Sequence, residues 1–310
     1  MFKKSLLTVL ITFLFAGSNS VFSQEAEGEA TDEDSAEVSD NDWDNWDNEW
    51  DWDDLNFEFD MFDSYKSPSI SLTYGLSNMK IHNFSESFAD PRIPEVKLGY
   101  TSEKPSWNEE NILQYKYSYL FLSNVTTDIS GTPEANEIES NLWRFGFGWA
   151  NGYGYSLGAG AVLPYNSYSF SWSRLDVKNF PTNPEDVNKL LLYDGSFRFG
   201  TGSEAGLRIR VIPLITFEAG YERSVIFERH LFWKWAGSAL IEASGHWALD
   251  AFVEKIMDSS PYAAPVVGFV LKSALSYGIY ELRQGKMNWP FSSAAPLSYD
   301  QVKFGMTFNF

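Results

Sequence analysis

The chain has 310 residues, a formal net charge of −19 and no cysteine. Without cysteine, a disulfide framework, thiolate chemistry and a lipoprotein anchor are excluded. The acidic balance excludes nucleic acid as a partner, because its phosphates require a basic surface.

The first residues have the organisation of a secretory signal peptide. Lys3 and Lys4 precede an apolar run from Leu6 to Ala16, and small residues follow before Gln24. The run is too short to cross a bilayer as a helix. We therefore predict a signal peptide over residues 1–23, cleaved after Ser23.

Residues 24–67 are predicted to form a disordered acidic arm. Residues 25–63 contain eighteen acidic and no basic residues, so nearly all the net charge lies there. The first half has too few apolar residues to offset the entropy of ordering it. The second half sets Trp43, Trp46, Trp50 and Trp52 among acidic residues. It is expected either to order against a partner or the base of the folded part, or to act as a solvated spacer with its aromatic residues at a membrane interface.

From residue 68 onward, bulky apolar residues alternate with small or charged ones, as in strands with two different faces. Five successive runs follow this rule, with bulky rows at Ile70–Leu76, Val96–Tyr100, Tyr115–Phe121, Trp143–Trp149 and Tyr153–Leu163. A soluble β-sandwich would instead place many charges on the outer face. The pattern predicts an antiparallel transmembrane β-barrel over residues 68–310, with bulky rows facing lipid and a tight, glycine-lined interior.

The connections between these runs suggest where the strands turn. Asn151-Gly152 is the strongest hairpin signal and predicts a type I′ turn, whereas residues 78–93 and 124–139 are long and polar. The row from Tyr168 to Trp172 either extends the fifth strand or begins another. Residues 205–221 form one long strand or a hairpin turning near Pro213. The expected total is eight or ten strands, an even number as in bacterial barrels.

Residues 227–298 are predicted to be a mainly helical insertion before the last strand. Apolar residues recur with helical spacing over Leu240–Ile256 and Val266–Leu282, and the pattern breaks from Asp258 to Pro261. The two apolar faces should pack on each other and over the barrel mouth, or offer a groove to a partner or to the lipid surface. An even strand count with a periplasmic arm places this insertion on the cell surface.

Two groups of residues could carry chemistry. Arg208, Arg210, Glu218 and Glu222 share the inward parity of their strands, as a structural charge cluster or as a determinant of solute selectivity. Glu242, His246, Asp250 and Glu254 lie four residues apart on one helix face. They are weak candidates for acid–base catalysis or metal binding, and a solvated face with local charge pairs is the alternative. No metal or cofactor is predicted.

The last strand alternates Val302, Phe304, Met306, Phe308 and Phe310 with polar or small residues, and it ends on an aromatic residue. It resembles the closing strand of small bacterial outer-membrane β-barrels. The resemblance implies export to the outer membrane, contact with its lipid, and Phe304, Met306, Phe308 and Phe310 as a signal read by the barrel-assembly machinery. The expected function is a structural or binding role in which the insertion and the arm contact a periplasmic or surface protein. A narrow solute channel is the alternative, and a lipid-modifying hydrolase is the second alternative.

Overall fold

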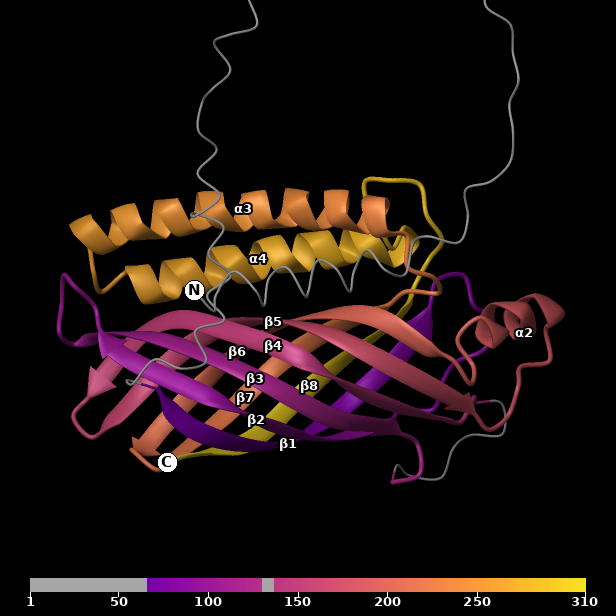
Figure 1. Ribbon diagram of the computed structural model, residues 1–310, viewed down its shortest axis with the longest axis horizontal. Coiled ribbons are helices and arrows are strands. Elements are labelled where there is room, and N and C mark those ends of the chain that lie inside the picture. Colours follow the sequence, from indigo (N-terminus) through magenta and orange to yellow (C-terminus); the bar gives the residue numbers. More distant parts are fainter. Residues whose placement is uncertain (1–65, 130–136) are drawn as a thin grey trace, which may run out of the picture. The chain divides into compact units, whose positions relative to one another are not determined.

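The computed structural model describes residues 66–129 and 137–310. The predicted signal peptide and nearly all of the predicted acidic arm lie outside the described residues. Eight antiparallel strands, each bonded to its neighbours in chain order, close into a barrel (Figure 1). They are β1 (Ser67–Ile81), β2 (Arg92–Pro105), β3 (Ile112–Thr126), β4 (Ser140–Leu157), β5 (Gly160–Val177), β6 (Phe197–Ile212), β7 (Ile215–Ile226) and β8 (Leu297–Asn309).

The barrel closes where the last strand pairs with the first. β8 is hydrogen-bonded to β7 on one side and to β1 on the other, with Phe308 opposite Ile70 in the β1 pairing. The count of eight is one of the two totals that the sequence predicts. The uncertain segment near Pro213 is a hairpin, because β6 ends at Ile212 and β7 begins at Ile215.

The connections differ in length between the two ends of the barrel. Links 106–111, 158–159 and 213–214 lie at the end that also carries the carboxyl terminus, here called the turn end. The four longer links lie at the opposite loop end, and the β5–β6 link there contains helix α2 (Pro184–Leu191). Short turns at one end and long loops at the other are typical of outer-membrane barrels.

The predicted turn at Asn151-Gly152 is wrong. Both residues lie within β4, and the hairpin turns at Gly158 and Ala159, where Gly158 has a φ of +69°. Gly152 serves a different purpose: a Cβ there would lie 2.1 Å from the carbonyl oxygen of Pro164 on β5. The glycine permits a close approach between strands. In the sequence, such a glycine cannot be told from one that forms a turn.

The predicted outward row on β3 is also wrong. Tyr115, Tyr117, Tyr119 and Phe121 face the interior, and Tyr115 is fully buried, whereas Leu120 is 64% exposed on the outer wall. Tyrosine suits this interior because its ring packs against cations, and at Tyr119 the hydroxyl also has a polar partner. The Arg208 guanidinium lies 5.1 Å from the Tyr115 ring centroid, and the Tyr119 hydroxyl bonds Ser167 at 2.7 Å.

Glycines on neighbouring strands make room for these tyrosines. A Cβ at Gly148 would lie 2.6 Å from the ring of Tyr119, and one at Gly206 would lie equally close to Tyr165. The interior is therefore glycine-lined as expected, but tyrosines fill the space. Ala161 and Leu163 are likewise buried rather than outward, because they follow the turn at Gly158.

Helices α3 (Phe232–Ser259) and α4 (Ala264–Gly285) form a hairpin between β7 and β8. The two predicted helices and the break between them are present, but the hairpin does not cover the barrel mouth. It runs along the outside of the barrel wall, from the loop end to the turn end and back (Figure 1). Its tip contacts the turn end, where the Asn108 side chain donates to the carbonyl oxygen of Met257 at 3.3 Å. Within the described residues, no helix is long and apolar enough to cross a membrane.

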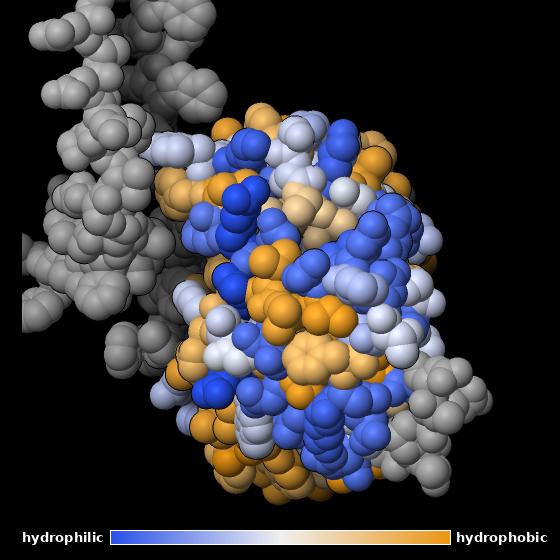
Figure 2. Space-filling model, turned by 90° about the vertical axis from the view of Figure 1, so that its right-hand side faces the viewer, coloured by the Kyte–Doolittle hydropathy of each residue, from blue (hydrophilic) through white to orange (hydrophobic). Residues whose placement is uncertain are grey.

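The loop end of the barrel is closed by packed side chains. A cluster of buried apolar residues there joins the strands to the loops and to α2, through Phe88, Ile138, Leu190 and Tyr193 among others. Figure 2 shows this end as a mostly hydrophilic face with a hydrophobic patch near its centre. In the described residues, packed side chains therefore cover this end of the barrel.

Candidate functional site

The interior of the barrel contains a buried network of four basic and four acidic side chains. All eight are at most 7% exposed, and they come from the inward rows of β2, β4, β6, β7 and β8. The network is neutral as a whole, which is the condition under which charges can be buried at acceptable cost. Its members are Glu95, Lys97, Arg144, Glu204, Arg208, Glu218, Glu222 and Lys303.

Lys303 on β8 is the centre of this network. Its Nζ lies 2.6 Å from Oε2 of Glu204, 2.6 Å from Oε2 of Glu222 and 3.1 Å from Oε1 of Glu95. One ammonium group therefore links β8 to β2, β6 and β7 across the lumen. Lys97 adds a second cation, 3.4 Å from Glu204.

The two arginines extend the network towards either end. A terminal nitrogen of Arg144 donates to Oε1 of Glu222 at 2.9 Å, towards the loop end. Arg208 donates to Oε2 of Glu218 at 2.7 Å, towards the turn end. Glu218 also accepts hydrogen bonds from Ser71 at 2.5 Å and from Thr307 at 3.3 Å, so its oxygens have partners on β1, β6 and β8.

The four predicted lumenal residues are thus divided among four ion pairs. Arg208 and Glu218 pair with each other, Glu222 pairs with Arg144 and Lys303, and Arg210 pairs with Glu103. Sequence reasoning missed five members of the network: Glu95, Lys97, Arg144, Glu204 and Lys303. A usable signal was present, because each lies on the face of its strand opposite the outward apolar row.

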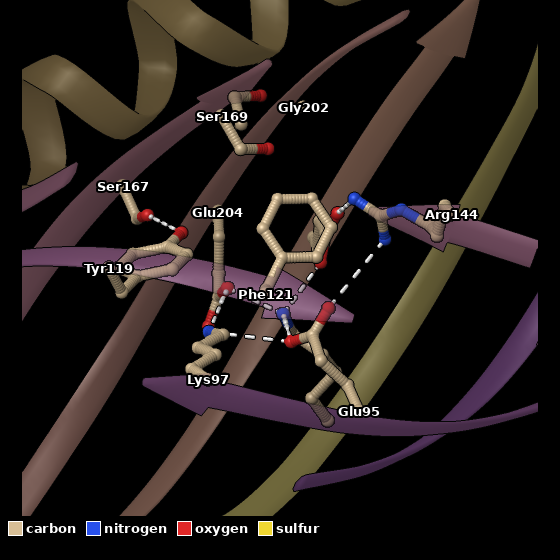
Figure 3. A pocket seen from close by; sticks show the side chains of 12 residues that line it. Glu95, Lys97, Tyr119, Phe121, Arg144, Ser167, Ser169, Gly202 and Glu204 are labelled. Carbon is tan, nitrogen blue, oxygen red and sulfur yellow. Dashed lines mark hydrogen bonds and ion pairs between the residues drawn. The ribbon is translucent and has the colours of Figure 1, made fainter. Parts of the chain in front are cut away.

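A small cavity lies among these charges, between Glu95, Lys97, Arg144 and Glu204 (Figure 3). Its volume is about 10 Å³, roughly the space that one water molecule needs. Tyr119 and Phe121 close one side of it. Towards the turn end, tyrosines and aliphatic residues fill the lumen in a second apolar cluster.

The helical stripe of Glu242, His246, Asp250 and Glu254 does not form a common site. Glu242 pairs with Arg283 at 2.8 Å and Asp250 pairs with Lys272, both on α4, and Glu254 is exposed. His246 lies against the wall, where its Nε2 is 3.0 Å from the hydroxyl of Tyr168. Among the described residues, no group of three or more His, Asp or Glu could hold a metal ion.

The predicted assembly-signal residues lie on the closing strand. Phe304 and Phe310 are exposed on the outer wall, and Met306 and Phe308 are partly covered there. These positions put an apolar row on the strand that seals the barrel. Whether an assembly machine reads that row remains a prediction.

No family model and no curated protein sequence matches this chain. Among solved structures it is similar to neisserial surface protein A, at 11% identity and a TM-score of 0.39, over 78% of this chain and 97% of that one. It is also similar to Ail, the attachment invasion locus protein of Yersinia pestis, at 10% identity and a TM-score of 0.32, over 79% and 99%. The strand order and closure described above place the chain in the class of closed eight-stranded antiparallel barrels.

Proposed function

We propose that this protein is an outer-membrane barrel with a structural or binding role, a closed anchor that holds its loop-end surface outside the cell. One observation carries the proposal: an apolar outer wall surrounds a packed, charge-neutral interior. Exposed apolar residues recur on the outward rows, which lipid can cover and water cannot favourably solvate. They include Leu72, Leu98, Leu120, Phe145, Ile209 and Phe304.

The lengths of the connections support one orientation in the membrane. Outer-membrane barrels keep short turns in the periplasm and longer loops outside. The turn end, with the carboxyl terminus, is then periplasmic. The loop end, with α2, faces outward and is the surface on which a protein partner would be bound.

The two alternative functions gain no specific support. A channel needs a continuous aqueous path, whereas apolar clusters lie on both sides of the central charges and the cavity there is about 10 Å³. For a lipid-modifying hydrolase, His246 is the histidine that the sequence offers as a candidate base. The Tyr168 hydroxyl instead contacts both His246 and Ser276, at 3.0 Å in each case.

Membrane fractionation combined with bilayer recording tests the proposal. The full-length protein should appear in the outer-membrane fraction and migrate faster on gels before boiling than after it. In planar bilayers it should give no conductance steps, while an open porin in the same bilayers serves as the positive control. Recovery in a soluble fraction would refute the location, and reproducible conductance steps would favour the channel.

The closing strand offers a second test of the location. Phe310 directly follows β8, and its backbone N–H donates to the carbonyl oxygen of Pro68 on β1 at 2.9 Å. If the assembly machinery reads this residue, deleting Phe310 should cause periplasmic accumulation and loss of heat-modifiable migration. Phe310→Tyr keeps an aromatic terminus and should insert normally. Insertion of the deletion variant at native levels would contradict an assembly role.

A further inference from the structure

We infer that the outer face of the α3–α4 hairpin lies in the hydrocarbon region of the membrane, where acyl chains cover it. The hairpin would then be a second, lipid-facing layer over one side of the wall rather than a surface domain. This inference rests on the proposed function, because it requires the barrel to sit in a bilayer.

The exposed face of α3 is apolar along the middle of the helix. Two polar side chains interrupt this face between Leu240 and Phe252. The Ser244 hydroxyl donates to the carbonyl oxygen of Leu240 at 2.8 Å, and the half-exposed Asp250 carboxylate is paired with Lys272. Apart from the paired Asp250 carboxylate, exposed charges lie beyond this stretch, with Lys234 the nearest on one side and Glu254 on the other. The apolar exposed residues are Leu240, Ile241, Trp247, Ala248, Ala251 and Phe252.

The exposed face of α4 repeats this arrangement. From Tyr262 at the tip, the exposed residues are apolar or aromatic as far as Tyr277, and the first exposed charge is Glu281. At a rise of 1.5 Å per residue, about 30 Å separates Lys234 from Glu254 on α3. About 27 Å separates Ala263 from Glu281 on α4. Both lengths match the apolar band of an outer-membrane barrel, which is about 25 Å tall.

Several polar side chains along the hairpin pair with each other instead of facing outward alone. Arg283 pairs with Glu242 and also donates to the Ser238 hydroxyl at 2.9 Å. Lys272 pairs with Asp250 across the two helices. A hairpin facing water would have the reverse arrangement, with its polar side outward. In lipid, charged side chains are stable when they pair with each other inside the protein, and apolar side chains face the acyl chains.

Polar side chains interrupt the apolar wall beneath the middle of the hairpin. The Asn166 amide donates to Ser273 at 2.9 Å, and Tyr168 contacts His246 and Ser276. These side chains point outward from β5 and would meet acyl chains if the hairpin were absent. We call this contact between the hairpin and β5 the seam.

Two charged wall residues are covered in the same way near the loop end. The guanidinium of Arg223 on β7 lies 4.5 Å from the ring centroid of Tyr277 and 5.6 Å from that of Tyr280. The Tyr280 hydroxyl donates to Asp300 on β8 at 2.5 Å. The inner side of each helix is partly polar because it covers these polar wall residues. Its outer side continues the apolar band of the barrel.

Single-cysteine labelling in vesicles tests this placement, and the native chain has no cysteine to remove. The hairpin variants are Phe252→Cys and Val270→Cys. Leu120→Cys on the open wall is the lipid control, and Leu191→Cys on α2 is the aqueous control; all four residues are more than half exposed. Each full-length variant carries an environment-sensitive NBD label and is refolded into phosphatidylcholine vesicles. Quenching is measured with doxyl-labelled phosphatidylcholine and with aqueous iodide.

The expected result is that labels at 252 and 270 are quenched by doxyl lipid as strongly as the label at 120, and escape iodide. The label at 191 should show the reverse. Suppose that the labels at 252 and 270 are quenched by iodide, like the label at 191, while the label at 120 is quenched by doxyl lipid. The hairpin inference then fails and the proposed function stands. If 120 itself escapes doxyl lipid, the proposed function fails.

Protection of 252 and 270 from both quenchers, with 120 quenched by doxyl lipid, would mean that protein covers the hairpin, and would also overturn the inference. Disulfide cross-linking of the unlabelled Val270→Cys variant then shows whether that protein is a second copy of this chain. Heat-modifiable migration confirms that each variant is folded. Trp247 and Val266 lie on the same helix faces, so Trp247→Cys and Val266→Cys replace any hairpin variant that does not fold.

Discussion

The lumen and the seam are both polar regions enclosed by apolar surfaces, yet they contain different groups. Eight strands surround the lumen, and it holds full charges, such as Lys303 at 2% exposure. Two helices on one side cover the seam, and its central contacts join hydroxyl, amide and imidazole groups. Its nearby ion pairs are less enclosed, since the Asp250 side chain is 47% exposed. The comparison teaches that a buried region can hold more full charges when counter-charges reach it from several strands, as three glutamates reach Lys303.

Breaking the lumenal network should have the largest effect. Lys303→Met removes the ammonium group shared by three glutamates and is expected to destabilise the barrel by about 3–5 kcal/mol. Urea-induced unfolding from vesicles, followed by tryptophan fluorescence, measures the loss. Lys80→Met is the matched control, because Lys80 is 40% exposed beside Asp300. Its pair should contribute about 0–1 kcal/mol. Similar losses for the two variants would show that the network is not the main stabilising element.

Two glycine substitutions should shift stability in opposite directions. Gly148→Ala places a Cβ 2.6 Å from the Tyr119 ring and 2.7 Å from the carbonyl oxygen of Tyr168. Overpacking of this kind costs about 1–3 kcal/mol. Gly278→Ala on α4 meets no atom within 4 Å and should gain up to about 1 kcal/mol from helix propensity. The same unfolding measurement compares them. A loss at Gly278 as large as that at Gly148 would mean that the hairpin is packed more tightly than described.

The seam should respond to loss of a single hydroxyl group. Tyr168→Phe leaves His246 and Ser276 without the oxygen that contacts both, at a cost of about 1–3 kcal/mol. Amide hydrogen exchange in α3 and α4 should increase more than exchange in β1 and β2. Tyr100→Phe, on the open wall, should change stability by less than about 0.5 kcal/mol. Exchange that rises equally in the barrel and in the hairpin would argue against a separate seam.

The smallest expected effect is a pH dependence at the loop end. Burial raises the pKa of Asp186 on α2, but hydrogen bonds from Ser85 and Lys189 outweigh it and hold this pKa below its ordinary value. A lowered pKa stabilises the contact above the unfolded value of about 3.9, and this stabilisation is lost as pH falls through the folded value.

Hydrogen exchange in residues 82–91 and 184–191, corrected for intrinsic rates, should therefore be steady from pH 7 to 5 and rise below about pH 4. Asp186→Asn should remove this rise, because an amide does not titrate in that range. Lys80→Met, outside this contact, should keep it. A pH profile unchanged in Asp186→Asn would assign the dependence to other groups.

Much of the fold was predictable because the outward rows of β1, β2, β4 and β8 follow a simple alternation. β3 misled the prediction because its inward row is aromatic, whereas its outward row begins with the polar residues Gln114, Lys116 and Ser118 before Leu120 and Leu122. Tyr115 and Tyr117 look like lipid-facing aromatics until the lumenal cations that pack on them are known. Gly152 misled it because a glycine needed for close strand approach has the same sequence signature as a turn.

The candidate site was less predictable than the fold. Arg208 and Glu218 could be grouped because they lie on neighbouring strands joined by a short turn. Lys303 and Glu95 come from opposite ends of the barrel sequence, and their contact depends on closure and register that no local pattern encodes. The hairpin was predictable as two helices. Its position was not, because a helix with an apolar face fits equally against lipid, protein or another helix.

The position of the hairpin between β7 and β8 has a consequence for folding kinetics. β8 completes the barrel by pairing with β1, which lies at the far end of the described chain. Contacts between such distant segments form slowly, since a large loop must be closed before they form. We therefore expect closure to be the rate-limiting step, with β1 and β8 the last strands to gain exchange protection during refolding.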